Sequence, residues 1–293
     1  MEVATLNNNL CVGDVAGASL TTGSVNTLIG AQTGGNMTTG SGNTAVGAFS
    51  MDSDSTGGFN SAFGRASLYV NTTGQRNTAL GFSTLFDNTE GSENVAVGNI
   101  ALADNISGDY NVAVGSSALN KSTAGDRNVA IGYKSLQTIA GDATSTRRNV
   151  SIGADAMNIS AASQGQVAIG YRALYSSNTG GGVANGDAQN VAIGYEAGDL
   201  VDDGTANVII GYQAGDALVS GSNNVIIGAG ADVDDTARTG CIILGRNATV
   251  SGDNQIGIPA SLAPAVVPAG AVDRSIAVNV PGLGVRYIAL QSL

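Results

Sequence analysis

The chain has 293 residues and a formal net charge of −11, with 43% apolar residues, 4% aromatic residues, 43 glycines and neither tryptophan nor histidine. Its apolar content excludes an intrinsically disordered chain, and its acidity disfavours binding to nucleic acid or to an anionic membrane surface. No apolar run reaches the roughly 18 residues that a membrane-spanning helix needs. The first thirteen residues do not resemble a signal peptide, so secretion by the general route is not expected.

A five-residue phrase recurs along the chain, as NVAVG at 94–98 and 111–115 and as NVAIG at 128–132. With the first residue of each phrase numbered position 0, there are 14 repeats, and eleven of the 13 spacings are 17 residues, the other two being 21 and 24. The repeats begin at Asn9, Asn26, Asn43, Asn60, Asn77, Asn94, Asn111, Asn128, Asn149, Gln166, Asn190, Asn207, Asn224 and Cys241. A fixed period of this kind predicts a solenoid, in which each repeat forms one coil.

Each phrase predicts a short strand, because β-branched residues and Thr precede a Gly at position +4. A second Gly often lies at position −3, as in Gly91 and Gly108. We expect both glycines to adopt positive φ where the chain reverses. Seventeen residues accommodate two short strands and two tight turns, so the sequence predicts an all-β chain folded as a parallel β-roll of about 14 coils.

Position 0 is Asn in every repeat except those of Gln166 and Cys241. In coils stacked in register, these amides would form a ladder along the solenoid. The alternative is that Asn only tolerates turn geometry at the start of the strand. Asp and Ser also suit turns but never occur there, which favours the ladder. Its expected members include Asn43, Asn60, Asn77, Asn94, Asn111 and Asn128.

The sizes of the side chains at positions +2 and +8 vary in opposite directions between repeats. In eight consecutive repeats, with +8 running from Met51 to Leu174, position +8 is Leu or Met and position +2 is Ala or Ser. In most of the others +8 is Gly, Asp or Thr and +2 is larger. Only the repeat of Ala192 and Gly198 has a small residue at both positions. Packed interiors tolerate volume-conserving exchange, so we expect both positions to fill the inside of the roll.

Position +3 is large and apolar in every repeat and points away from +2, since side chains alternate along a strand. A thin roll has only one inside, so this second apolar face requires a partner. We expect parallel copies of the same chain to present their +1/+3 faces to a common axis. Residues expected at this seam include Val97, Val114, Ile131, Ile152, Ile169 and Ile193.

These phrases resemble known repeats. NVAIGYKS (128–135) resembles the repeat of trimeric autotransporter adhesin heads, and GDRNVAIGYKSL (125–136) is similar to repeats in bacteriophage tail-fibre proteins. The resemblance covers about residues 9–258 and implies a left-handed parallel β-roll, a parallel homotrimer and a surface adhesin. Autotransporter adhesins need a signal peptide, a stalk and a membrane anchor, which the sequence does not predict, and their usual repeat is shorter. A phage fibre assembles in the host cytoplasm, so the phage interpretation is favoured, with the virion as the final location.

The sequence divides into four segments. Residues 1–8 are a lead-in, where a partner could join, and residues 9–258 are the solenoid. All four prolines follow residue 258, and 259–271 is typical of an extended linker. Residues 272–293 contain two apolar stretches joined by PGLG, which predicts a β-hairpin that caps the solenoid or docks to another virion protein.

Two repeats are longer than the others, by four residues within 137–148 and by seven within 175–189. Insertions in repeat arrays become loops on one face, often the binding face, although they can also be slack without a partner. Aromatic residues also recur at position +5, where they contact a glycan or simply cover the turn. The candidate contacts to a host-cell glycan or protein are Arg147, Arg148, Tyr171, Tyr175, Tyr195 and Tyr212.

No catalytic, cofactor or metal site is expected. VIIGAGADV (225–233) resembles the hexapeptide repeat of β-helix acyltransferases, but those keep a six-residue rhythm and typically use His. The acidic group at 232–235 lacks calcium-loop spacing, and Cys11 and Cys241 lie too far apart for a disulfide. The favoured function is a structural phage fibre with a receptor-binding surface. The alternatives are a passive trimeric shaft or head-decorating fibre and, less favoured, a depolymerase spike with paired carboxylates.

Overall fold

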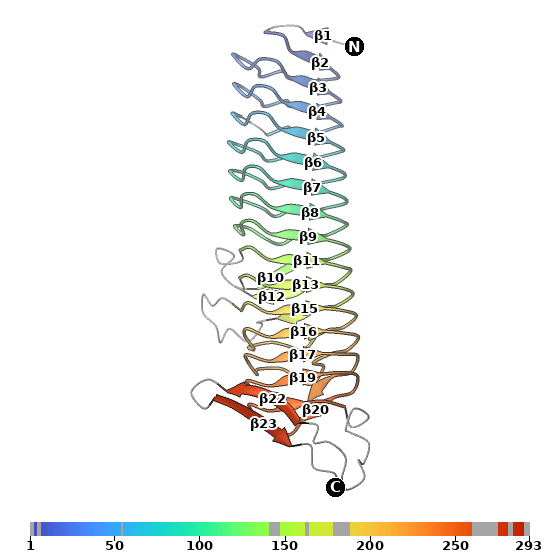
Figure 1. Cartoon of the computed structure of the whole chain (residues 1–293). Coiled ribbons are helices and arrows are strands. Elements are labelled where there is room, and N and C mark those ends of the chain that lie inside the picture. Colours follow the sequence, from blue (N-terminus) through green and yellow to red (C-terminus); the bar gives the residue numbers. More distant parts are fainter. Residues whose placement is uncertain are drawn as a thin grey trace.

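The structure is a computed structural model, which describes residues 3–4, 7–53, 55–140, 147–161, 164–177, 188–259, 275–280 and 284–289. The repeats form an all-β parallel solenoid of about 13 turns with the 17-residue period, as the sequence predicts (Figure 1). The described residues contain no helix able to cross a membrane.

One 16-stranded sheet runs the length of the solenoid. Its strands are β1 (Val3–Ala4), β2 (Leu10–Val12), β3 (Thr27–Ile29), β4 (Thr44–Val46), β5 (Ser61–Phe63), β6 (Thr78–Leu80), β7 (Val95–Val97), β8 (Val112–Val114), β9 (Val129–Ile131), β11 (Val150–Ile152), β13 (Val167–Ile169), β15 (Val191–Ile193), β16 (Val208–Ile210), β17 (Val225–Ile227), β19 (Ile242–Leu244) and β21 (Ile256–Gly257). From β2 to β19 all pairs are parallel and match position for position, as in Val95 with Val112. The antiparallel β1 covers the edge of β2, a short pairing within the lead-in that the sequence did not predict.

Positions +2 and +8 fill the interior together, which confirms the prediction from their exchanged volumes. Ala113 and Leu119 of one coil are both fully buried, and so are Leu28 and its counterpart Ile209 in coils with Gly at +8. A Cβ added to Gly34 would lie 2.9 Å from Leu28 Cδ1. The large +2 side chain therefore occupies the space that a +8 Leu takes elsewhere.

The exceptional coil with Ala192 and Gly198 is filled from its neighbours. A Cβ added to Gly198 would lie 2.8 Å from Ile209 Cδ1 of the following coil and 3.4 Å from Leu174 Cδ2 of the preceding coil. The switch from a large +8 to a large +2 residue takes place at this coil. Val201 of the same coil would lie 3.2 Å from that Cβ, so the space beside the small pair is occupied from its own coil and from both neighbours.

The two glycine columns have different roles, which partly corrects the prediction. The +4 glycines all have positive φ, between 115° and 144°. The −3 glycines Gly91 and Gly108 do not, and they are required for another reason: an added Cβ would collide with the carbonyl oxygen of the equivalent glycine in the next coil. That tight stacking leaves the carbonyl oxygen beside the position-0 Asn, which donates a hydrogen bond to it.

Non-glycine residues make most of the sharp corners. Positions −1, +6 and +8 are left-handed in coil after coil, for example Tyr110 (φ 59°), Ser117 (φ 58°) and Leu119 (φ 51°). Each such residue costs on the order of 1 kcal/mol. Backbone bonds between coils hold the conformation, as in Leu119 N–H to Ser135 O at 3.0 Å. These corners were not predicted, because positions −1 and +6 hold side chains of many kinds and position +8 is Leu or Met in most of the middle repeats.

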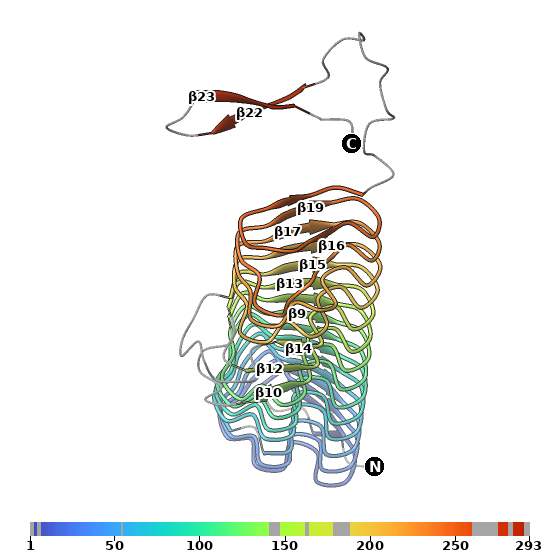
Figure 2. The same ribbon diagram turned by 90° about the horizontal axis from the view of Figure 1, so that it is seen from below.

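The two longer repeats and the regular repeat between them build an additional parallel sheet from β10 (Thr138–Ala140), β12 (Ile159–Ala161) and β14 (Ser176–Ser177). These strands lie one above another on a different part of the coil outline from the main sheet (Figure 2). Residues 141–146 and 178–187, in the two insertions, lie outside the described residues. A further pair, β18 (Asp232–Val233) and β20 (Thr249–Val250), forms near the last coils.

The C-terminal segment contains the hairpin expected from its sequence. Strand β22 (Ser275–Val280) pairs antiparallel with β23 (Gly284–Ala289), on either side of residues 281–283. The predicted linker at 259–271 falls outside the described residues except for Pro259.

Candidate receptor-binding surface

Buried asparagines connect the coils and fix the register of every exposed column. Asn111 Nδ2 donates to Gly125 O at 2.7 Å, and Asn111 Oδ1 accepts from the backbone N–H of Asn128 at 3.0 Å. Equivalent bonds recur along position 0, whose members are at most 5% exposed. The amides thus form a ladder, with the added feature that most Nδ2 groups donate to the carbonyl oxygen of the −3 residue of the next coil, which is usually glycine.

A second ladder lies at position +11 in the middle of the solenoid. Asn88 Nδ2 donates to Asn71 Oδ1 at 2.9 Å, and Asn105 Nδ2 donates to Asn88 Oδ1 at 2.6 Å. The column ends at buried Ser122, and neither Asn105 Oδ1 nor Ser122 Oγ has a partner. Sequence reasoning missed this ladder, although three asparagines spaced by 17 residues were a visible signal.

The main sheet presents a continuous apolar face to the outside. In β7 and its neighbours the +2 side chain is buried, while +1 and +3 are half-buried or exposed. Ile131 and Ile193 are exposed, and the other four seam residues are half-buried: Val97, Val114, Ile152 and Ile169. The structure therefore places all six predicted seam residues on one outward face.

Three of the predicted contact residues come together at position +5. Tyr171 stacks on Tyr195, and Tyr195 stacks on Tyr212, with ring centroids 5.2 Å apart in both pairs. All three side chains are exposed. Desolvation and the adjacent Glu196 carboxylate raise the pKa of the Tyr195 phenol. These tyrosines form an aromatic row parallel to the solenoid axis, beside the end of the outward strands.

Tyr175 is attached to this row through Arg172. The Arg172 guanidinium lies 4.4 Å from the centre of the Tyr175 ring and forms ion pairs with Asp199 at 3.3 Å and Glu196 at 3.8 Å. Burial raises the pKa of the Asp199 carboxyl, and Arg172 opposes that shift. The start of the second insertion is thus fixed next to the aromatic row.

Arg147 and Arg148 lie apart from the tyrosines. They occupy positions −2 and −1, at the opposite end of the outward strand from position +5. Arg147 Nε lies 3.3 Å from Asp126 Oδ2, and Arg148 is exposed. The six predicted contacts therefore separate into a tyrosine group and an arginine group.

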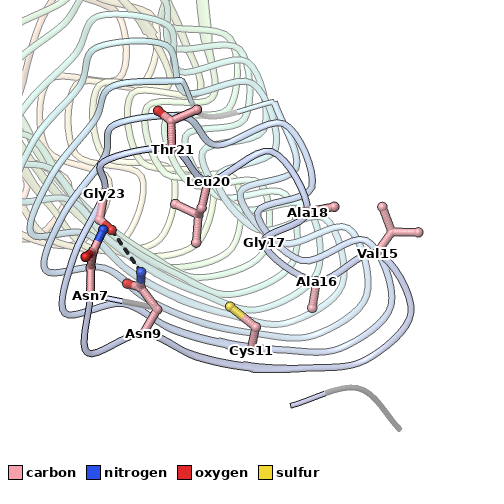
Figure 3. Close-up of a pocket in the computed structure, with 10 residues that line it drawn as sticks. All are labelled: Asn7, Asn9, Cys11, Val15, Ala16, Gly17, Ala18, Leu20, Thr21 and Gly23. Atoms are coloured by element: carbon pink, nitrogen blue, oxygen red, sulfur yellow. Dashed lines mark hydrogen bonds between the residues drawn. The ribbon is translucent and has the colours of Figure 1, made fainter. Parts of the chain in front are cut away.

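A cavity of about 240 Å³ opens at the N-terminal end of the roll. Figure 3 shows Cys11 on the strand and Leu20 across the coil, both pointing into the opening, with Asn9 bonded to Gly23 beside them. These side chains occupy the interior columns that further coils would otherwise cover. The cavity is the uncovered end of the interior columns and is lined by residues of the first coil, including Cys11 and Leu20.

Acidic side chains near the last coils are paired within the chain. Asp232 accepts backbone N–H bonds from Ala217 and Val233, and Asp234 pairs with Arg238 at 2.7 Å. Among the described residues, no three acidic, Cys or His side chains gather as metal ligands. Cys11 and Cys241 are buried free thiols, the small apolar role expected for them.

No protein-family model matches the chain, and no curated protein is significantly similar to it in sequence. The features that bear on function are the apolar face, the aromatic row and the solenoid that positions them.

Proposed function

We propose that the chain is a structural fibre protein of a phage virion, which forms a left-handed, parallel homotrimer and displays a surface that binds the host receptor. The apolar outward face carries this proposal. It extends from β2 to β19, and its members Leu80 and Ile131 are 48% and 38% exposed in the single chain. An apolar surface of this length on a lone chain would promote aggregation.

Copies of the same chain are the partner that fits this face. Every coil repeats the same outward positions, so a parallel copy in register meets like residues with like along the whole length. Three chains around one axis and the left-handed turn follow from the resemblance to adhesin and tail-fibre repeats. The acidity of the chain, with a net charge of −11, supports solubility of the elongated particle.

Oligomeric state tests the proposal directly. Mass photometry of the full chain is expected to give a particle of three chains, each of 28.9 kDa. Ile131→Lys places a charge in the seam and is expected to release monomers or aggregates. Ser107→Lys, at an exposed position away from that face, is the matched control and should leave the trimer intact. A soluble wild-type monomer would refute the trimer.

Receptor binding is the part that separates an adhesin from a passive shaft. The exposed tyrosines and the adjacent insertion favour an adhesin, since regular coils alone would suffice for a shaft. Purified trimer is expected to bind intact host cells and to compete with infection by the parent phage. Binding without competition would favour a passive or head-decorating fibre. Release of reducing sugar from the host polysaccharide would instead support a depolymerase.

A further inference from the structure

The aromatic row ends at an open ring face. The centroid spacing of 5.2 Å between Tyr171 and Tyr195 is close to the rise of about 4.8 Å per coil, so their ring planes stack along the solenoid axis. Tyr195 covers one face of Tyr171. The other face is directed toward the coil that begins at Asn149, where position +5 is Ala154.

A second aromatic residue lies on the far side of Ala154. Tyr133 is the +5 residue of the coil before it and is 51% exposed. Two coils separate Tyr133 from Tyr171, which places their rings about 10 Å apart along the axis. Position +5 of the coil between them is Ala154, whose side chain is a single methyl group.

In an earlier part of the solenoid, a side chain of the protein lies between two aromatic rings that are two coils apart. The Arg65 guanidinium lies 5.6 Å from the Phe49 ring and 5.7 Å from the Phe82 ring, on consecutive coils. A polar group held between two aromatic rings is thus an arrangement that these turns already support. At Ala154 the equivalent +5 residue carries only a methyl group and cannot fill the space between two rings in this way.

From this spacing we propose that the interval above Ala154, between Tyr133 and Tyr171, binds one pyranose ring of a host surface polysaccharide. A flat ring held between two aromatic rings fills only about 7–8 Å. A puckered saturated ring is thicker and carries C–H groups on both faces, which pack against the negative faces of aromatic rings.

The surrounding charges favour a sugar over a cationic peptide. Lys134 Nζ already lies 5.1 Å from the Tyr133 ring centre, so a second cation would be repelled. Asp155 follows Ala154 in the chain. Its carboxylate oxygens can accept hydrogen bonds from sugar hydroxyl groups.

This inference rests on the proposed adhesin function and gives it a ligand class. The test is Ala154→Tyr, which fills the interval with the residue that other coils carry at +5. Ala229→Tyr is the matched control, because it adds the same side chain in the same column beyond Tyr212. The probe is an array of bacterial surface polysaccharides and their oligosaccharide fragments. Since the chain has no tryptophan, tyrosine fluorescence provides a second readout of binding.

Wild type and Ala229→Tyr are expected to bind the same polysaccharide, and Ala154→Tyr and Tyr171→Ala to lose at least tenfold in affinity. Particle mass and thermal midpoint, compared with wild type, show whether each variant retains its assembly and fold. Unchanged affinity in a folded Ala154→Tyr variant would overturn the inference. Absence of glycan binding by wild type would also overturn it, and host-cell binding would then decide separately whether the adhesin function stands.

Discussion

The middle coils, which begin at Asn43 through Gln166, fill the interior of the solenoid mainly with the +8 side chain of the turn. The coils on either side of them fill it mainly with the +2 side chain of the strand. In the middle coils a small strand residue such as Ala113 faces a large turn residue such as Leu119. In the flanking coils a large strand residue such as Leu28 faces a turn glycine, Gly34. The backbone pairing of the main sheet is the same in both regions.

This difference shows which part of the repeat sets the fold. The coil outline is fixed by bonds between coils, including the position-0 ladder, and it leaves a constant internal volume. Either the strand, at position +2, or the turn, at position +8, can supply the side chain that fills that volume. Ladder substitutions should therefore have the same effect in both regions, whereas interior substitutions should depend on the region.

The largest effect is expected from breaking the ladder. Asn111→Ala removes the donor to Gly125 O and the acceptor of the Asn128 N–H, which leaves both buried groups unpaired. At about 1–3 kcal/mol for each group, the loss is about 2–6 kcal/mol. Asn207→Ala in a flanking coil should cost the same, because it breaks equivalent bonds. Denaturant unfolding measures both.

Asn120→Ala is the control for these ladder variants. Asn120 is also largely buried, but its side chain donates a single bond, to Ile100 O at 2.8 Å. A loss as large as that of Asn111→Ala would contradict the special role of position 0.

The next prediction tests the difference in interior packing between the middle and the flanking coils. Ala113→Leu overfills a middle coil and is expected to cost about 1–3 kcal/mol. Adding Leu119→Gly converts that coil to the flanking type and should recover part of the loss. Glycine also suits the left-handed φ of 51° at this position. If the double variant is less stable than Ala113→Leu alone, positions +2 and +8 do not share one space.

A smaller gain is expected where the second ladder stops. Ser122→Asn supplies an Nδ2 donor to the unpaired Asn105 Oδ1, in the way that Asn105 donates to Asn88. One added buried hydrogen bond stabilises by about 1 kcal/mol. The thermal midpoint should rise for Ser122→Asn and stay close to wild type for Ser122→Ala. A lower midpoint for Ser122→Asn would show that the ladder cannot be extended into that coil.

The smallest effect concerns pH. Burial and then the Asp87 carboxylate raise the pKa of Asp104 in the middle coils, and burial raises that of Asp199 in the flanking coils. A raised folded-state pKa stabilises below the unfolded value of about 4, and that contribution is lost as pH rises through the folded pKa. Thermal midpoints should therefore fall from pH 4 toward pH 7. Asp104→Asn should reduce this slope, and an unchanged slope would argue against the burial of that charge.

The sequence predicted the columns of the fold because each repeat makes the same contacts as the next. Position 0 became a buried ladder, +2 and +8 became the interior, and +1 and +3 became the outward face. The hairpin at β22 and β23 was also predictable, from two apolar stretches around PGLG. In a solenoid, residues at the same position of successive repeats lie next to one another along the axis.

Several features depended on the tertiary structure. The left-handed corners at Tyr110 and Leu119 do not depend on glycine, because backbone hydrogen bonds between coils hold them. Across the second insertion, Tyr171 and Tyr195 are 24 residues apart, and they stack because the strands on either side of the insertion pair in register, as in Ile169 with Ile193. The sequence by itself determined the repeat and its inner and outer faces. Only the stacking of complete coils decided which exposed side chains meet.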